Sequence, residues 1–398
     1  MRGLLGRATA LLLGTLFAVL AGEAATALLL SERVARARVS RVVESERGKF
    51  CRYHSTLGWE GRPGVRDEFQ WADCRHHVAQ NEQGFRGPAY GPARSRVPRL
   101  VVLGDSFVWG FGVEEDEVFA AVLARSTGAE VVNAGVSGYG PDQCFLSWKQ
   151  HGAAWAPDEV ALFVTLANDL DDVASTERYG YAKPAFRLGA DGALQLTGVP
   201  VPVVDWAAAA RPMPLRLKQG RLGAILERSA LFTLASDALA RTAWAGPPLE
   251  AAGLVPSGGA DSPLVLDTHP ASRAVEEEWR LLGAIVRALR DDVRRRGARL
   301  TVVAVPAADE VYDDRWDRRV AHVRLEPGVV LDRTEPGRRL AALAREAGAQ
   351  AIDLLPELRR AGLSDRRLYY PVNHHWTASG HRLVAGVLAA QLGLGPRP

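Results

Sequence analysis

Four polar positions, far apart in the sequence, have the residue types that acyl transfer requires. Ser106 and Asn168 each follow a short apolar run, a glycine-containing turn at residues 133–135 follows another, and His375 lies near the C-terminus. A serine supplies a nucleophile, a histidine accepts its proton, and N–H donors stabilise the oxyanion that forms on the attacked carbonyl. The pattern predicts a serine-dependent site, provided that the fold brings these positions together.

The segments that must position these residues alternate between apolar runs and helical stretches. Strands are expected at 99–103, 130–132, 160–166, 300–305 and 351–354. Helices are expected at 118–124, 141–150, 274–296, 338–347 and 377–392. Such alternation is typical of a parallel sheet with right-handed crossovers, in which ligands bind beyond the carboxyl ends of the strands.

Proline and glycine interrupt this alternation at about residues 174–270, where a small hairpin around Asp191-Gly192 and a helix near 226–240 are expected. The sequence therefore predicts one α/β domain over residues 98–398 with an insertion. An extracytoplasmic connector at 31–97 and an N-terminal segment at 1–30 precede it.

The N-terminal segment is apolar from residue 8 to residue 30 except at Glu23. As a helix it would span roughly 34 Å, enough for a bilayer core. Ala25-Thr26-Ala27 is a candidate signal-peptide cleavage site, but the apolar run continues past it. We therefore expect an uncleaved transmembrane signal anchor, although the arginines that follow oppose export on a positive-inside count. The expected location is the cell membrane, single-pass, with the catalytic domain extracytoplasmic.

The connector contains two cysteines, Cys51 and Cys74, each followed three residues later by a histidine. In an oxidising compartment a Cys51–Cys74 disulfide is the simplest expectation. A zinc site with His54 and His77, or unpaired thiols, are the alternatives. Cys144 is expected to be a small buried hydrophobe.

Composition and charge limit the classes of function that the protein can have. The chain has 398 residues and a formal net charge of +3, which gives no electrostatic support for a nucleic-acid partner. The hydrophobic fraction of 47% excludes a disordered protein. No phosphate loop, dinucleotide fingerprint or catalytic metal constellation is present, so no cofactor is expected. The near-neutral charge fits a neutral or weakly charged ester substrate.

The residues that carry a family resemblance form four blocks: Gly104-Asp105-Ser106, Gly135, Asn168-Asp169 and His375-Trp376. In order and placement they resemble the blocks of the SGNH/GDSL hydrolases. This resemblance implies a flavodoxin-like doubly wound parallel sheet. The connector is similar to that of membrane-anchored bacterial members that act in the cell envelope. The His-Trp pair further resembles the D-x-H-W block of alginate-type polysaccharide O-acetyltransferases.

The resemblance assigns roles to these residues. Ser106 would be the nucleophile and His375 the general base. The oxyanion hole would consist of the Ser106 and Gly135 N–H groups with the Asn168 side-chain amide.

Asn373 departs from the D-x-H-W pattern because it stands where the triad acid is expected. Its carbonyl can orient the histidine, but it cannot stabilise an imidazolium as a carboxylate does. Three outcomes follow: slow catalysis with Asn373, a carboxylate from elsewhere such as Asp365, or a site that only binds. The neighbouring His374 is expected at the surface, His381 on a helix face, and Gly138 in a turn.

Three functions fit these residues. The first is a serine esterase that removes O-acyl groups, above all O-acetyl, from an envelope glycan through an acyl-Ser106 intermediate. The second is a polysaccharide O-acetyltransferase with the same Ser-His site. The third is a non-catalytic glycan-binding scaffold. The expected partners are an acylated glycan or small ester, and the membrane through the N-terminal helix.

Overall fold

The computed structural model describes most of the chain. The described residues are 2–31, 34, 48–71, 74–178, 181–203, 229–240, 267–321, 327–371 and 373–395.

A five-stranded parallel sheet forms the centre of the molecule. Its strands are β5 (Arg99–Leu103), β6 (Glu130–Asn133), β7 (Glu159–Thr165), β13 (Arg299–Val305) and β15 (Gln350–Asp353). Their order across the sheet is β15-β13-β7-β5-β6, and each neighbouring pair is parallel. Counted along the chain this is the order 2-1-3-4-5 of flavodoxin-like folds, with the reversal between β5 and β7. The predicted doubly wound parallel sheet is confirmed.

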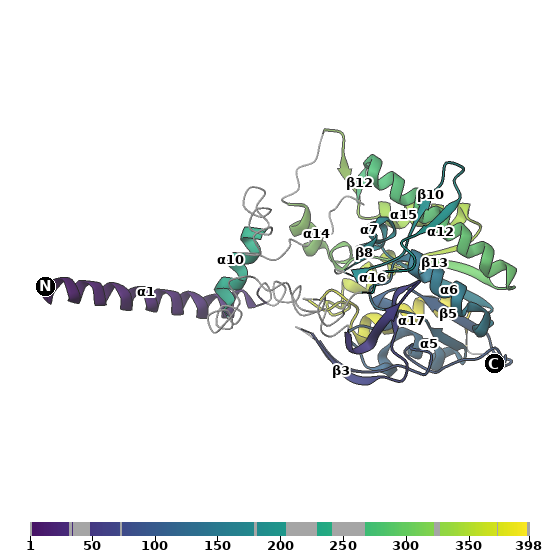
Figure 1. Ribbon diagram of the computed structural model, residues 1–398, viewed down its shortest axis with the longest axis horizontal. Coiled ribbons are helices and arrows are strands. Elements are labelled where there is room, and N and C mark those ends of the chain that lie inside the picture. The colour runs from purple at the N-terminus through teal and green to yellow at the C-terminus, as the bar shows by residue number, and fades with distance from the viewer. Residues whose placement is uncertain are drawn as a thin grey trace.

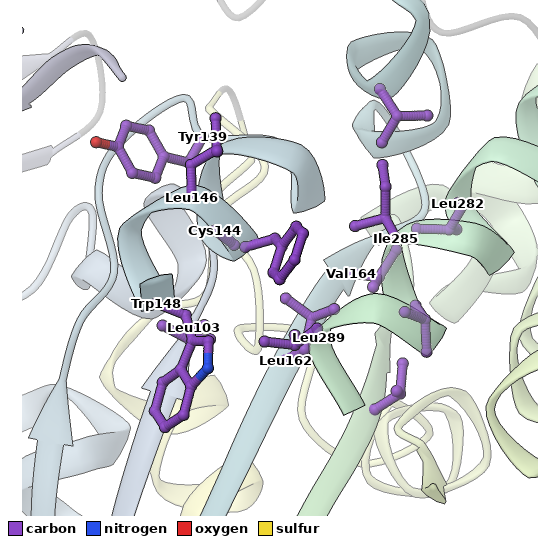
Figure 2. Packing of buried hydrophobic residues seen from close by; sticks show 14 of the residues in the cluster. Leu103, Tyr139, Cys144, Leu146, Trp148, Leu162, Val164, Leu282, Ile285 and Leu289 are labelled. Carbon is purple, nitrogen blue, oxygen red and sulfur yellow. The ribbon is translucent and has the colours of Figure 1, made fainter. Parts of the chain in front are cut away.

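Helices cover both faces of this sheet, so its strands are apolar on both sides. One face packs on α6 (Pro141–Trp155), α12 (Arg273–Arg295) and α15 (Glu335–Glu346). The other packs on α5 (Phe119–Thr127), α16 (Leu355–Gly362) and α17 (Ala378–Gln391). Figure 2 shows Leu162 and Val164 of β7 meeting Leu289 and Ile285 of α12 in the first layer. All five central strands thus end at one edge, where the polar loops lie.

Short elements complete the body around that edge. They are α4 (Ser106–Trp109), η1 (Glu115–Glu117), α7 (Asp169–Ala174), α13 (Ala308–Val311), α14 (Asp313–Val320) and the two-stranded sheet of β12 (Thr268–His269) with β14 (Val330–Leu331).

The connector contains two antiparallel hairpins that the sequence did not predict. The first pairs β1 (Cys51–His54) with β2 (Gly58–Gly61), and the second pairs β3 (Arg66–Trp71) with β4 (Cys74–Ala79). Trp59 of β2 is fully buried and donates its indole N–H to the Ser137 carbonyl at 3.1 Å. The hairpins therefore pack against the loops that follow the central strands.

Arg86, at the end of this region, fixes the loop after α4. Its guanidinium is fully buried and donates to the carbonyls of Gly110 at 2.6 Å and Val113 at 3.1 Å. Its Nε pairs with the Glu115 carboxylate at 3.0 Å. A buried arginine with these partners satisfies carbonyls that would otherwise be unpaired.

The insertion begins with two small hairpins. They consist of β8 (Glu177–Arg178) with β9 (Tyr181–Ala182), and β10 (Ala185–Leu188) with β11 (Leu194–Thr197). The second is the predicted hairpin. The predicted helix corresponds to α10 (Ala230–Ala240), while residues 204–228 and 241–266 lie outside the described residues.

The N-terminal helix α1 (Arg2–Leu29) projects away from the α/β body, and α10 lies beside its C-terminal end (Figure 1). Glu23 of α1 accepts hydrogen bonds from the Ser229 hydroxyl at 2.7 Å and the Leu231 N–H at 3.0 Å. α1 also carries Arg2 and Arg7. The predicted transmembrane anchor is corrected here: no helix within the described residues has both the length and the apolar character to cross a membrane.

Candidate acyl-transfer site

Ser106 lies directly beyond the carboxyl end of β5, at the first position of α4. The preceding Asp105 caps this turn, because its Oδ1 accepts the Phe107 N–H at 2.9 Å. Gly104 is needed for the close approach of the turn to the strand: a Cβ there would come within 2.4 Å of the Val108 side chain. Gly104 and Asp105 are therefore explained by the geometry of the turn, and Ser106 by the chemistry of the site.

His375 lies in the loop between α16 and α17 and reaches back to Ser106. Its Nε2 is 2.7 Å from the Ser106 Oγ. The loop is fixed by a hydrogen bond from Tyr370 N–H to the His375 carbonyl at 2.8 Å, and by Trp376, which is fully buried. The structure thus brings together the predicted nucleophile and base.

Two phenylalanines enclose the imidazole. Phe111 stacks on the His375 ring with centroids 4.2 Å apart and planes 21° apart. The centroid of the Phe107 ring lies 4.8 Å from that of His375. Phe107 also makes an edge contact with the ring of Trp376. Trp376 accordingly supports the histidine through Phe107, a role in packing.

Asn373 contacts His375 from the side opposite to Ser106. His375 Nδ1 is 3.1 Å from the Asn373 backbone carbonyl and 3.3 Å from its side-chain Oδ1. Both oxygens are acceptors only, so Nδ1 must carry the proton and Nε2 is left with its lone pair. The Ser106 hydroxyl can then donate to Nε2, which is the arrangement that a general base requires.

Asp365 does not replace Asn373. Its carboxylate accepts the Arg367 N–H at 2.9 Å and lies 3.6 Å from the Arg367 side chain. Within the described residues no carboxylate forms a hydrogen bond or ion pair with His375. Burial therefore lowers the pKa of His375 to about 3, and the neighbouring His374 acts in the same direction. The base is neutral at physiological pH, and its imidazolium is poorly stabilised.

The predicted oxyanion donors differ in whether their N–H groups already make a hydrogen bond within the protein. The Gly135 N–H donates to Asn133 Oδ1 at 3.1 Å, and a Cβ at Gly135 would come within 2.4 Å of the Trp109 nitrogen. Gly135 is thus a glycine because α4 packs against it, and its N–H is already engaged. Among the described residues, the Ser106 N–H makes no hydrogen bond with the protein and is free for an oxyanion.

Asn168 is engaged as well. Its side-chain amide donates to Asp169 Oδ1 at 2.8 Å and to Asp172 Oδ2 at 2.9 Å, which uses both of its hydrogens. In this conformation Asn168 satisfies two buried carboxylates. The predicted oxyanion role would require its amide to leave them.

Gly138, which the sequence assigns to a turn only, offers a donor instead. It has a φ of +82°, a conformation that side-chain-bearing residues rarely adopt. Within the part of the chain that the structure describes, its N–H also makes no hydrogen bond. The 135–140 segment contains three glycines, and the sequence does not say which N–H the Asn133 side chain occupies.

A buried group of aspartates lies behind Asn168. Burial raises the pKa of Asp105 to about 6 and raises that of Asp169 well above its ordinary value. The cations that balance this group come from the insertion. Arg178 pairs with Asp172 at 2.5 Å, and the Lys183 ammonium pairs with Asp142 at 2.5 Å. The beginning of the insertion is therefore part of the support of the site.

The remaining predicted residues serve packing. His381 is buried in α17, where its Nδ1 accepts the Phe119 N–H at 3.2 Å. Cys51, Cys74 and Cys144 are buried thiols, so the expected Cys51–Cys74 disulfide is not formed. The zinc alternative has no support either: in the described residues no group of three or more such side chains could hold a metal ion. Instead, Cys74 lies beside the site, where its Sγ accepts the Asn373 amide at 3.5 Å.

A flavodoxin-like sheet, with a serine beyond its first strand and a histidine before its last helix, is the arrangement that the resemblance to the SGNH hydrolases implied. Comparison with known families gives a match over about the C-terminal third of the chain. Residues 265–397 match the family described as the SGNH hydrolase-like domain of acetyltransferase AlgX. The matched segment contains the His-Trp block, as the resemblance implied.

Among curated proteins, the "Probable alginate O-acetylase AlgJ" of Pseudomonas aeruginosa is 28% identical over 123 residues. The match covers 31% of this chain and 28% of that protein, so this chain spans under a third of its relative's length.

Solved structures of hydrolases are also similar. LAE5, an alpha/beta hydrolase from the metagenome of Lake Arreo, is 14% identical with a TM-score of 0.39, over 75% of this chain and 95% of that one. The acetyl xylan esterase AlAXEase is 11% identical with a TM-score of 0.36, over 74% and 99%.

Proposed function

We propose that the protein transfers O-acetyl groups of a polysaccharide through an acyl-Ser106 intermediate. The observation that carries the proposal is the 2.7 Å contact between Ser106 Oγ and His375 Nε2. A non-catalytic glycan-binding scaffold has no need for a serine aligned with a histidine whose tautomer is set by two acceptor oxygens. The similarity to acetyltransferase AlgX and to AlgJ supports acetyl as the acyl group and a polysaccharide as its carrier.

The chemistry follows from these positions. The Ser106 proton passes to His375 Nε2 while Oγ attacks the acyl carbonyl carbon, which forms a tetrahedral oxyanion. As this intermediate collapses, the bond to the leaving alcohol breaks, and His375 returns the proton to the departing oxygen. An acceptor hydroxyl then gives its proton to His375 and attacks the acyl-Ser106 carbonyl. As this second tetrahedral intermediate collapses, the bond to Ser106 Oγ breaks and His375 returns the proton to Oγ, which regenerates the serine.

The oxyanion would be held by the N–H groups of Ser106 and Gly138. Both follow the carboxyl ends of neighbouring strands, and neither is engaged by the described residues. Gly135 is a weaker candidate because Asn133 already accepts its N–H. Loss of one such donor typically costs about 2.7–4 kcal/mol of transition-state stabilisation.

Water or a sugar hydroxyl can serve as the acceptor at the same site. With water the protein is an esterase, and with a sugar hydroxyl it is an O-acetyltransferase. The match of residues 265–397 to an acetyltransferase domain favours the second candidate.

The test uses p-nitrophenyl acetate with the full-length protein. Wild type should release p-nitrophenol with a burst equal to the enzyme concentration, and Ser106→Ala should show neither burst nor turnover above the uncatalysed rate. Equal turnover by both proteins would remove Ser106 as the nucleophile. A transferase should convert acetylated oligosaccharide faster in the presence of an acceptor oligosaccharide than in water alone, whereas an esterase should not respond to the acceptor.

The location is a proposal too. We propose that the catalytic domain lies outside the cytoplasm at the cell envelope, and the support for this is the polysaccharide substrate proposed above. Protease added to intact spheroplasts should degrade the domain if it is outside, and should leave it intact if it is cytoplasmic.

A further inference from the structure

Asn373 is held at both ends of its side chain. Its Oδ1 accepts the His375 backbone N–H at 2.8 Å and lies 3.3 Å from His375 Nδ1. Its Nδ2 donates to the Sγ of Cys74 at 3.5 Å. We propose that Cys74, which belongs to the connector and not to the α/β domain, is the positioning residue that keeps the Asn373 carbonyl directed at His375. This inference rests on the proposed function of the Ser106–His375 pair.

The direction of the amide matters because its two ends have similar shape and opposite chemistry. If the amide were reversed, its NH2 group would face the two N–H groups of His375. The imidazole would then keep only the Asn373 backbone carbonyl as an acceptor for Nδ1–H. A carboxylate would present an acceptor oxygen in either direction, so an acid at this position needs no such control. The requirement therefore arises from having an asparagine at position 373.

Cys74 is suited to this task because burial and strand pairing hold its side chain in place. It is 8% exposed at the start of β4, where it pairs with Trp71 of β3. Its neighbours in the buried cluster include Phe69, Trp109 and Phe111. A thiol accepts an amide N–H weakly and without charge.

The same cluster supports the other side of the histidine. Phe111, which packs in the cluster with Cys74, stacks on the His375 ring at 4.2 Å. The β3–β4 hairpin thus contacts Asn373 directly through Cys74, and it reaches the His375 ring only through Phe111, on which Phe69 of β3 packs at 4.8 Å. A positioning role of the connector is therefore supported by one direct contact and by one indirect packing contact.

A double-mutant cycle tests the proposal. Cys74→Val replaces the thiol by a side chain that suits a strand but accepts no hydrogen bond. In the wild-type background we expect kcat for p-nitrophenyl acetate to fall about tenfold, the equivalent of one hydrogen bond, with KM unchanged. In the Asn373→Asp background we expect Cys74→Val to lower kcat by less than about twofold, because a carboxylate presents an acceptor oxygen to His375 in either orientation. Cys51→Val, in the other connector hairpin, is the matched control and should leave kcat unchanged in both backgrounds.

An equal loss in both backgrounds would overturn the proposal, since general damage to the hairpin does not depend on residue 373. Urea unfolding of the four proteins separates lost stability from lost orientation. If Cys74→Val does not fold, Cys74→Ser keeps an acceptor and should retain more activity than Cys74→Ala. The reverse order would contradict an acceptor role.

A second measurement does not depend on turnover. The ¹⁵N shifts of His375 should show the Nδ1–H tautomer alone in wild type and a mixture of tautomers in Cys74→Val. Unchanged shifts would refute the inference even if Ser106 is the nucleophile. Turnover that survives in Ser106→Ala would instead refute the proposed function and leave the ¹⁵N result to decide the role of Cys74.

Discussion

The Ser106 hydroxyl lies 2.7 Å from Nε2 of His375, although the two residues are 269 positions apart. Ser106 follows the strand at which the sheet order reverses, and His375 lies in the loop before the last helix. Neither side chain is placed by its neighbours in sequence alone. The parallel sheet brings the two loops to one edge, and Phe107 and Phe111 hold the imidazole in place.

Asn373→Asp should raise the rate of p-nitrophenyl acetate turnover at pH 8. A carboxylate beside Nδ1 stabilises the imidazolium that forms in the transition state, which the amide cannot do. We expect a gain on the order of 10²-fold, below the 10⁴ seen for the reverse change in a serine triad, because the tautomer is already correct here. Asn373→Ala, the control, should be slower than wild type. An unchanged rate in Asn373→Asp would mean that this residue does not act as the third member.

The pH dependence of kcat/KM should change with the same substitution. Activity requires neutral His375, so it falls as the pH drops through the pKa of that residue. In wild type this pKa is lowered to about 3 by burial, and the acid limb should lie below pH 4. In Asn373→Asp the added negative charge raises the pKa, so the limb moves to higher pH. An acid limb near pH 6–7 in wild type would show that a carboxylate reaches His375.

Asn168→Ala should affect stability more than catalysis. The Asn168 amide is the donor to two buried carboxylates, Asp169 and Asp172. Its removal leaves both with one partner fewer, which lowers the free energy of unfolding by about 1–3 kcal/mol. Urea unfolding and steady-state kinetics on the same preparation check this. A loss of about 10²–10³ in kcat with unchanged stability would instead make Asn168 an oxyanion donor.

The strands of the sheet and the candidate residues Ser106 and His375 were predictable because local signals mark them, although their contact is a tertiary one. Runs such as Arg99–Leu103 are apolar on both faces, and the chemistry-bearing residues follow directly where such runs end. The order of strands was implied by the family resemblance, since the rules of parallel sheets limit the possible orders without fixing one. These signals make Ser106 and His375 candidates, and the family resemblance assigns their roles.

The connector hairpins were not predictable from the same signals. β1 and β2 have four residues each, and their pairing depends on Trp59 and Tyr139, which lie in different parts of the chain. The engagement of the Gly135 N–H by Asn133 and of Asn373 by Cys74 are likewise tertiary contacts. Residue types at one position carry no information about such partners, so the oxyanion donors were assigned by resemblance alone.

His76→Phe should stabilise the protein. His76 is 1% exposed among aromatic rings, and within the described residues neither of its ring nitrogens has a hydrogen-bond partner. Removing a buried polar group of this kind should raise the free energy of unfolding by about 1–3 kcal/mol. Turnover should change less than twofold, because Phe69 and Phe111 keep their aromatic neighbour. A large loss of kcat with retained stability would show that His76 has a chemical role.

The gain from His76→Phe should grow as the pH falls. Burial, with a smaller effect of Arg86, lowers the pKa of His76 to about 3, against its ordinary value of 6.5. Between these values the unfolded chain binds a proton that the folded protein does not, so this histidine destabilises the fold progressively below pH 6.5. Unfolding at pH 7.5 and pH 5 should therefore show a larger difference between variant and wild type at pH 5. Equal differences would mean that His76 is protonated in the folded state.

Lys183→Met should be strongly destabilising, and a second substitution should restore most of the loss. The side chains of Lys183 and Asp142 are both fully buried, and their charged atoms are 2.5 Å apart. Without the ammonium, Asp142 is a buried carboxylate with no cation, which should cost about 3–5 kcal/mol. Burial already raises the pKa of Asp142 with Lys183 present, so in Lys183→Met the carboxyl should bind a proton and the loss should be greater at pH 8 than at pH 5.

The double variant Asp142→Asn with Lys183→Met removes both charges at once. It should recover more than half of the stability that Lys183→Met loses, and its residual defect should be independent of pH. The control is Lys149→Met, which removes an exposed lysine of α6 whose ammonium lies over the ring of Phe145. Additive losses in the double variant would contradict a buried ion pair. Because the Lys183 ammonium also donates to the Asp172 carbonyl at 2.8 Å, the single variant should loosen the turn that carries Asn168 and lower kcat more than KM.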